Sequence, residues 1–151
     1  MITAFRILKA SRIDGAFSGI GAAKSGGRWN SPGMRAVYVS STRSLSVLET
    51  LVHLDSGSLP LSFVCIPVSF RLDQIEVLDR STLPKRWMDP GALELRAIGD
   101  EWLGSRQSLA LQVPSAIIPQ EFNFVLNPEH PKFSTIVQKS PENFRFDPRL
   151  K

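Results

Sequence analysis

The chain contains few of the residues that build cross-links and metal sites. Its 151 residues include one cysteine and two histidines. One cysteine excludes an internal disulfide framework, and neither histidine stands near the cysteine, so no zinc-ligand spacing is present. Cys65 lies in the apolar segment 61–66, which predicts a buried core thiol rather than a nucleophile.

Long hydrophobic runs are absent as well. No segment approaches the roughly 20 apolar residues that cross a bilayer, and residues 1–9 lack the apolar core of a signal peptide. These absences predict a cytoplasmic protein without membrane contact. No internal repeat or low-complexity linker interrupts the chain, and its length suits one domain over residues 1–151.

Charge of one sign is not concentrated anywhere. Lysine and arginine total 18 against 14 acidic residues, giving a net charge of +4 and a pI of about 9.6. This balance suits an anionic ligand or an acidic protein partner, and nucleic acid stays open as a partner. The basic residues are scattered, with no run of five or more, which is typical of a solvated surface.

Hydrophobic periodicity predicts an α+β fold with a largely antiparallel or mixed sheet. The predicted strands are 4–8, 36–40, 61–70, 75–78, 109–113, 124–126, 134–137 and 144–146. One helix is expected over 43–54, and a second begins at Asp89-Pro90, ends near Gly104 and has an apolar side of Leu93, Ala97, Ile98 and Trp102. Residues 14–33 hold six of the ten glycines and are predicted to form a long functional loop.

Two candidate site residues belong to this loop and the strand after it. Arg28 follows Gly26 and Gly27, and glycines allow a ligand to approach while arginine offers a planar fork for phosphate or carboxylate. A solvated loop arginine is the simpler interpretation. Tyr38 is predicted to face away from Val37 and Val39, because neighbouring strand residues point to opposite faces.

Two more candidates are a helical acid and a serine at a strand end. Glu49 completes a possible capping box from Ser46, but a helix that starts near Thr42 or Ser44 uses more of the apolar pattern and puts Glu49 mid-helix. There it borders the apolar stripe, where an unpaired carboxylate is costly, so pairing or function is expected. Ser115 is either a simple turn serine or a hydroxyl that meets a ligand.

Taken together, these segments resemble the RES domain, a toxin family named for its Arg, Glu and Ser. The segments that carry the resemblance run nearly end to end: Phe5-Arg6-Ile7, Gly26-Gly27-Arg28-Trp29-Asn30-Ser31-Pro32-Gly33, Val37-Tyr38-Val39-Ser40, Leu48-Glu49-Thr50-Leu51-Val52-His53, Leu111-Gln112-Val113-Pro114-Ser115-Ala116, Asn123-Phe124-Val125-Leu126-Asn127-Pro128-Glu129-His130-Pro131 and Phe144-Arg145-Phe146-Asp147-Pro148-Arg149-Leu150. Each is weak alone, but their shared order is specific. Residues 11–24 and 79–90 match less clearly.

The resemblance implies an ADP-ribosyltransferase-like fold and an enzyme that cleaves NAD at the nicotinamide–ribose bond. NAD is then a substrate, no separate cofactor or metal is expected, and phosphate, water or a protein accepts the fragment. The implied partner is an Xre-type antitoxin, with nucleic acid reached only through it.

For this chemistry we expect Glu49 to stabilise the developing ribosyl cation, Arg28 to hold phosphate or ribose, and Tyr38 to stack on nicotinamide. Ser115 is expected to hydrogen-bond the substrate or Glu49. Arg6 and Asn127 are predicted second contacts. The alternatives are an RNA-targeting toxin or nucleic-acid-binding module, and a non-catalytic interaction domain in which Arg28 and Glu49 pair with each other.

Overall fold

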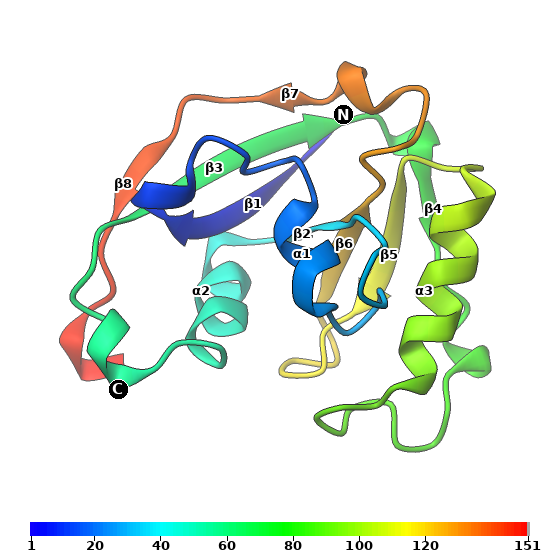
Figure 1. Ribbon diagram of the computed structural model, residues 1–151, viewed down its shortest axis with the longest axis horizontal. Coiled ribbons are helices and arrows are strands. Elements are labelled where there is room, and N and C mark those ends of the chain that lie inside the picture. The colour runs from blue at the N-terminus through cyan, green and yellow to red at the C-terminus, as the bar shows by residue number, and fades with distance from the viewer. Residues whose placement is uncertain (151) are drawn as a thin grey trace.

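One eight-stranded mixed sheet organises the computed structural model, which describes residues 1–150 (Figure 1). The strand order is β4-β5-β6-β2-β1-β3-β7, with β8 also beside β3. The strands are β1 Ile2–Lys9, β2 Val37–Ser40, β3 Phe63–Phe70, β4 Ile75–Val77, β5 Ala110–Pro114, β6 Phe122–Leu126, β7 Val137–Gln138 and β8 Glu142–Phe144. Only β4 and β5 pair in parallel. The predicted α+β class with a mixed sheet is confirmed.

The sheet is nearly divided between β1 and β2. These strands are paired at one position, Phe5 with Ser40, whereas β1 is paired with β3 along its whole length. In Figure 1, β1 and β3 cross the upper left of the molecule at a steep angle to β5 and β6. The two parts of the sheet therefore open away from each other next to β2, and this opening positions the candidate site.

Among residues 1–150, three α-helices and six short 3-10 helices surround the sheet. The α-helices are α1 Ile20–Ser25, α2 Arg43–Leu51 and α3 Glu94–Ser105, and the 3-10 helices are η1 Ala10–Arg12, η2 Ser56–Ser58, η3 Leu72–Gln74, η4 Arg80–Thr82, η5 Phe133–Thr135 and η6 Pro148–Leu150. None of the helices in residues 1–150 has the length and apolar character that a membrane span requires.

Alternation along β2 separates two parts of the core. Val37 and Val39 are buried in one cluster with β3 and β6, while Tyr38 packs on the opposite face with Trp29 and α3. This arrangement confirms the prediction that Tyr38 faces away from its two valine neighbours. A third cluster holds α2 against β1 and β3 and includes Cys65, so the prediction of a buried thiol is also confirmed.

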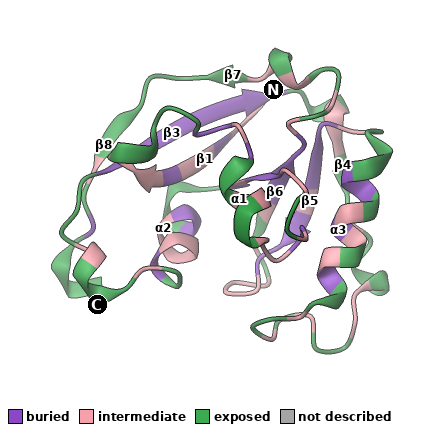
Figure 2. Ribbon diagram, in the orientation of Figure 1, coloured by how far each residue is buried: buried purple, intermediate pink, exposed green. Residues whose placement is uncertain are grey.

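Strand β3 is buried along its whole length, as Figure 2 shows. Its interior proline, Pro67, is tolerated because neither β7 nor β8 pairs with this position on the outer side of the strand. β8 pairs with residues 63–65 and β7 with Val68 and Ser69, so no ladder requires an N–H from Pro67. The Pro67 carbonyl accepts a hydrogen bond from the Lys139 N–H there, over 2.9 Å.

The helical predictions need three corrections. The expected loop 14–33 contains α1, which has no buried residue and therefore no apolar periodicity to reveal it. Helix α2 ends at Leu51 rather than at residue 54. Helix α3 begins at Glu94, because Asp89 forms an ion pair with Arg86 over 2.6 Å instead of capping a helix.

The predicted core side of α3 is only partly correct: Trp102 is buried and Ile98 packs against the same core cluster, but the other two residues are not in the core. Leu93 is 64% exposed and Ala97 is exposed as well. The buried residues of the helix are Leu95, Gly99, Trp102 and Leu103. The true core side therefore includes a glycine, which a pattern of large apolar residues cannot register.

Two C-terminal strands were misplaced. Residues 133–135 form η5, and β7 begins only at Val137, so the strand predicted over 134–137 is largely wrong. β8 covers Glu142–Phe144 rather than 144–146. Both are short edge strands with mostly exposed residues, which lack the alternation that identifies a strand.

Candidate active site

Helix α2 carries Glu49 and is fixed at its start by Thr42. The Thr42 side chain accepts a hydrogen bond from the Leu45 N–H over 3.0 Å, which satisfies one of the free donors at a helix N-terminus. The alternative capping box from Ser46 is not used. Because α2 ends at Leu51, Glu49 lies in its last turn rather than in its middle.

The Glu49 carboxylate is held by two donors from the far part of the sheet. Ser115 donates its hydroxyl to Glu49 Oε1 over 2.8 Å, and Asn123 donates its amide Nδ2 to the same oxygen over 2.7 Å. No residue among 1–150 donates a hydrogen bond to the other oxygen, Oε2, and that oxygen is not sealed from water. One carboxylate oxygen is therefore fixed, and the other is available to a ligand.

The direction of the Ser115 hydroxyl follows from its own surroundings. Its oxygen accepts hydrogen bonds from the Ile117 and Ile118 N–H groups, each over 3.1 Å. A hydroxyl oxygen has two acceptor sites, so the hydroxyl hydrogen is left to point at Glu49. Because Ser115 is fully buried, it contacts the acid rather than a bound substrate.

Asn123 was not predicted as a site residue. It lies on β6 directly opposite Ser40 of β2, on the face that also carries Tyr38. Ser40 donates its hydroxyl to Asn123 Oδ1 over 2.7 Å. The available signal was an asparagine at an inward position of an otherwise apolar strand.

Arg6 lies where β1 and β2 diverge. The Tyr38 carbonyl has no backbone partner on β1, and the side-chain Nη1 of Arg6 donates to it over 2.9 Å. Arg6 Nε is buried without a hydrogen-bond partner among residues 1–150, and burial lowers the pKa of the guanidinium from 12.5 to about 10. A buried cation with an unsatisfied donor is costly, so Arg6 is a candidate for a functional role.

Tyr38 and Asn30 tie the glycine-rich loop to β2. The Tyr38 hydroxyl donates to Asn30 Oδ1 over 2.6 Å and accepts from the Trp29 N–H over 3.0 Å. Asn30 is fully buried, and its Nδ2 donates to the carbonyls of Ala22 and Met34, each over 2.9 Å. Tyr38 therefore holds the loop through its hydroxyl, in addition to any contact that its ring makes.

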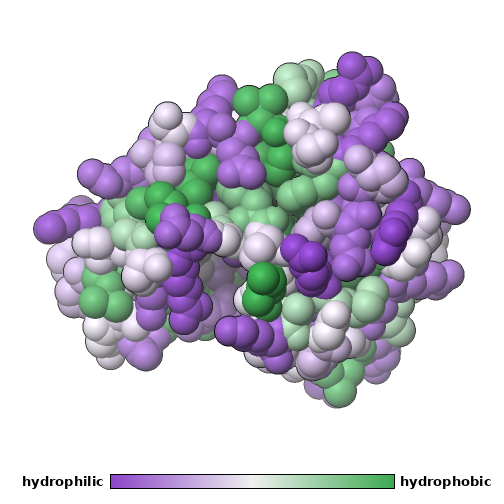
Figure 3. All heavy atoms as spheres, turned by 45° about the horizontal axis from the view of Figure 1, so that its top comes forward, coloured by the Kyte–Doolittle hydropathy of each residue, from purple (hydrophilic) through white to green (hydrophobic). Residues whose placement is uncertain are grey.

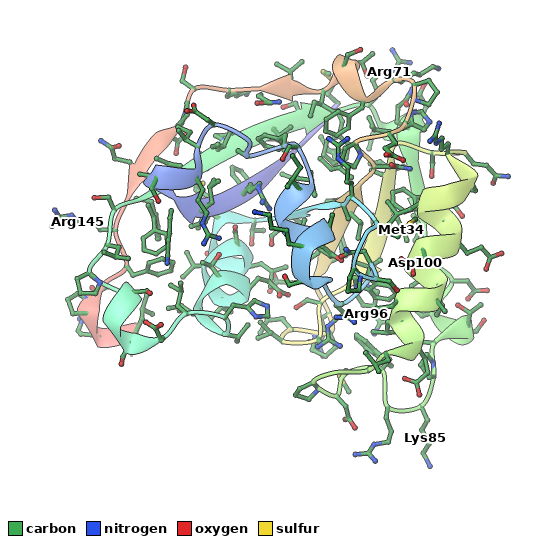
Figure 4. The ribbon with its side chains drawn as sticks, viewed as in Figure 1. Met34, Arg71, Lys85, Arg96, Asp100 and Arg145 are labelled. Atoms are coloured by element: carbon green, nitrogen blue, oxygen red, sulfur yellow. The ribbon has the colours of Figure 1, made fainter. Side chains whose placement is uncertain are left out.

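Helix α3 holds the same loop from the other side. Arg96 Nε donates to the Gly27 carbonyl over 3.0 Å, and Asp100 Oδ1 accepts from the Ser31 N–H over 2.9 Å. Figure 4 shows both α3 side chains on the helix side that faces this loop. A Cβ added to Gly99 would overlap the Trp29 carbonyl oxygen, so only glycine lets the two backbones approach this closely.

Arg28 contacts the loop over residues 79–93. Its Nη1 donates to the carbonyls of Trp87 and Asp89, over 2.9 and 3.3 Å. Among residues 1–150, no hydrogen bond is made by the rest of this guanidinium, and Arg28 and Glu49 form no ion pair. The premise of the non-catalytic alternative, a mutual Arg28–Glu49 pair, is therefore wrong.

The electrostatic surroundings of Tyr38 keep its hydroxyl protonated. Burial raises its pKa well above the ordinary value of 10.0, although the hydrogen bond from Trp29 and the charges of Arg96 and Arg28 oppose this effect. The same hydroxyl thus lies within electrostatic reach of two guanidinium groups. Two arginines and the Asp100 carboxylate thus lie on the loop side of β2, and the Glu49 carboxylate lies at the end of β2 and β6.

Asn127 does not join this cluster. It follows the far end of β6, its Nδ2 donates to the Leu103 carbonyl over 2.9 Å, and its Oδ1 accepts from the Glu129 N–H over 3.0 Å. At about 3.3–3.4 Å per strand residue, it lies roughly 13 Å along the strand from Asn123. Its buried amide therefore contacts α3 through Nδ2 and the chain after β6 through Oδ1. This is a structural role.

A surface cavity also lies elsewhere. It has a volume of about 520 Å³ and is lined by residues of the 13–17 segment, Ile66, Phe133 and the 138–141 segment. Figure 3 shows a separate notch at the lower edge of the molecule, between the left and right lobes of that view. Among residues 1–150, no three His, Cys, Asp or Glu side chains converge as metal ligands.

The family model described as RES domain matches residues 3–147. The chain belongs to the RES domain family. A relative named Toxin Res from Yersinia enterocolitica serotype O:8 / biotype 1B is 40% identical to this RES domain protein over 149 residues, which cover 97% of this chain and 98% of the relative. The predicted resemblance is therefore confirmed.

Two further comparisons concern a second relative and a solved structure. A relative named Prs ADP-ribosylating toxin from Sphingobium sp. is 38% identical over 137 residues, covering 88% of this chain and 85% of the relative. The toxin–antitoxin complex of MbcT and MbcA from M.tuberculosis contains a chain that matches 99% of this one, with a TM-score of 0.76 and 17% identity over 86% of that chain. The latter likeness shows a shared fold. This RES domain protein is thus a relative of proteins named as toxins.

Proposed function

We propose that this RES domain protein is the toxin of a toxin–antitoxin pair and cleaves the nicotinamide–ribose bond of NAD. The observation that carries the proposal is the geometry of Glu49. Its Oε1 is fixed by Ser115 and Asn123, and its Oε2 has no donor among residues 1–150. A preoriented carboxylate stabilises a cation that develops in the transition state, and does so at no reorganisation cost.

The chemistry needs few groups from the protein. When the bond between ribose C1′ and the nicotinamide nitrogen breaks, the electron pair goes to that nitrogen and neutralises the pyridinium ring. The leaving group therefore needs no general acid. The remaining ribosyl carbon is oxocarbenium-like, as in glycoside cleavage, and Glu49 lies against this charge in our proposal. An acceptor oxygen or nitrogen then bonds to C1′. Water or a protein acceptor loses its proton to solvent in this step, whereas an anionic phosphate oxygen has no proton to lose.

The arginines suit the opposite part of the substrate. NAD carries a pyrophosphate, and arginine binds phosphate through paired N–H donors. In our proposal Arg28 and Arg6 hold this pyrophosphate or the ribose beside it, and the cost of keeping the Arg6 Nε donor unsatisfied supports a functional role for this guanidinium. Tyr38 contributes its ring as a stacking surface. Asn127 is left out, because both ends of its amide contact backbone groups.

Three acceptors fit this mechanism: inorganic phosphate, water or a protein side chain. The relative named Prs ADP-ribosylating toxin supports a protein acceptor. The structurally similar toxin–antitoxin complex supports an antitoxin partner, and the resemblance stated above makes an Xre-type protein the candidate. NAD is a substrate in this proposal, and no additional cofactor is invoked.

The decisive experiment follows nicotinamide release from NAD by purified protein, with and without phosphate and with candidate acceptor proteins. Wild type should release nicotinamide, and Glu49→Gln should be slower by about 10²–10³-fold, by analogy with the loss of one oxyanion donor. Glu101→Gln, an exposed helical acid on α3, is the matched control and should keep full activity. Equal rates for wild type and Glu49→Gln would remove the proposed role of the carboxylate.

A further inference from the structure

Asn123 connects Glu49 to β2 through a directed chain of hydrogen bonds. Ser40 and Asn123 are register partners on β2 and β6. The Ser40 hydroxyl donates to Asn123 Oδ1 over 2.7 Å, and Asn123 Nδ2 donates to Glu49 Oε1 over 2.7 Å. Ser40 is 4% exposed and Asn123 is partly buried, so water competes little for these bonds.

The Glu49 carboxylate sets the direction of the chain, because it only accepts hydrogen bonds, whereas the Ser40 hydroxyl can donate or accept. An asparagine side chain has an acceptor end and a donor end. In the reverse orientation an amide oxygen would face the carboxylate oxygen, and two acceptors without a shared hydrogen repel each other. The Asn123 amide therefore turns its donor end toward Glu49, and Ser40 holds its acceptor end.

Two donors on one oxygen restrict Glu49 more than either does alone. Ser115 approaches from the end of β5 and Asn123 from β6. Together they fix the rotation of the carboxylate, so Oε2 keeps one direction. Ordering a flexible glutamate side chain costs rotamer entropy. Here that entropy is already lost on folding, so the cost does not arise when substrate binds.

We infer that Asn123 is a positioning residue for Glu49 and that Ser40 holds the acceptor end of the Asn123 amide in place. This inference rests on the proposed NAD cleavage. Asn123 acts through Glu49 and has no contact with substrate. Its loss should lower kcat and leave KM for NAD nearly unchanged, because an interaction needed only for transition-state stabilisation is removed.

The test compares four variants by NAD turnover and melting temperature. We expect Asn123→Ala to lower kcat by about 10–100-fold, the range for one hydrogen bond to a charged group, with KM within about twofold of wild type. Asn123→Asp should be worse, because it sets a second carboxylate against Glu49. Ser40→Ala should be milder, and adding it to Asn123→Ala should cost little more, since the two residues act in one chain.

Asn143, an exposed strand residue on β8, provides the matched control. Asn143→Ala should keep the kcat of wild type. If Asn123→Ala proves unstable, Ser40→Ala still tests the chain, because it removes only one hydroxyl. A wild-type kcat in folded Asn123→Ala, or a raised KM with unchanged kcat, would overturn the positioning role.

A second measurement separates this inference from the proposed function. The carboxyl ¹³C resonance of Glu49 reports the donors on Oε1 without any turnover. It should move in Asn123→Ala and Ser40→Ala and stay in place in Asn143→Ala. An inactive wild type would defeat the proposed NAD cleavage, whereas an unmoved resonance in Asn123→Ala would defeat the positioning of Glu49 by Asn123.

Discussion

The hydroxyl of Tyr38 and the amide of Asn30 are joined by a 2.6 Å hydrogen bond in which tyrosine donates. Through it, a strand residue holds the conformation of the loop that carries Arg28. Asn30 is fully buried and contacts backbone carbonyls before and after it. The tyrosine that we expect to stack on nicotinamide is thus also part of the framework of the site, and its two roles can be separated by substitution.

Tyr38→Phe should keep the ring and lose the anchor. We expect the free energy of unfolding to fall by about 1–3 kcal/mol, because the buried Asn30 Oδ1 loses its donor and the Trp29 N–H its acceptor. NAD cleavage should persist, since the stacking surface remains, whereas Tyr38→Ala should lose it. Denaturant titration and nicotinamide release measure the two effects. An inactive Tyr38→Phe with wild-type stability would instead place the hydroxyl in the chemistry.

Alkaline titration offers an independent check on the same residue, because Tyr38 is the only tyrosine in the chain. Burial raises its pKa above the unfolded value of 10.0. The stability from this shift is fully present below pH 10 and is lost as pH rises through the folded pKa, since the unfolded chain then releases the proton more readily. Tyrosinate absorbance should therefore appear only as the protein unfolds. Ionisation near pH 10 in the folded protein would contradict the buried hydroxyl.

Gly99→Ala tests the contact between α3 and the glycine-rich loop. The new methyl group would overlap the Trp29 carbonyl oxygen, and backbone on both sides leaves little room to relax. We expect a loss of about 3 kcal/mol or more in unfolding free energy. Gly104 is the control in the same helix, because nothing lies within 4 Å of an added Cβ there. Gly104→Ala should be neutral or stabilising by about 0.5–1 kcal/mol.

Elements with strong local signals were predictable from sequence. The apolar run of β3 and the alternation around Tyr38 follow from burial on a sheet, and both are confirmed. Helix α1 was not predictable, because its six residues have no buried member. The Asp89-Pro90 start was misleading, because tertiary contacts engage this segment: Arg86 pairs with the Asp89 carboxylate, and Arg28 binds its carbonyl.

The candidate site shows the same division. Glu49 and Ser115 stood out by residue type and position, and the structure joins them directly. Asn123 did not, because its value depends on the pairing of β2 with β6, which brings Ser40 next to a residue 83 positions away. Asn127 is a further example. The motif that contains it predicted a contact with substrate, whereas in the structure its amide donates a hydrogen bond to α3.

Arg28→Ala should affect both substrate binding and the loop 79–93. Removal of the guanidinium leaves the Trp87 and Asp89 carbonyls without this donor. We expect KM for NAD to rise about tenfold, for the loss of one charged hydrogen bond, and trypsin to cut after Lys85 or Arg86 several times faster. Arg106→Ala, which removes an exposed ion pair with Glu129, is the control. An unchanged KM together with unchanged proteolysis would deny both roles.

Arg6→Met should separate stability from function. The fall in the pKa of Arg6 from 12.5 to about 10 corresponds to a free-energy penalty of about 3 kcal/mol for burying the charged guanidinium. The penalty is fully present at neutral pH, where both folded and unfolded chains are protonated, and it is relieved only as pH rises above 10. The hydrogen bond to the Tyr38 carbonyl stabilises the folded protein by about 1.5–3 kcal/mol.

These opposing contributions nearly cancel, so Arg6→Met should unfold at a denaturant concentration equal to or slightly above that of wild type. Its NAD turnover should nevertheless fall and its KM should rise, because the unpartnered donor at the division of the sheet is lost. Arg12→Met, at an exposed position, should change neither property. A loss of more than about 2 kcal/mol in Arg6→Met, with KM unchanged, would make Arg6 a structural residue and remove it from the proposed site.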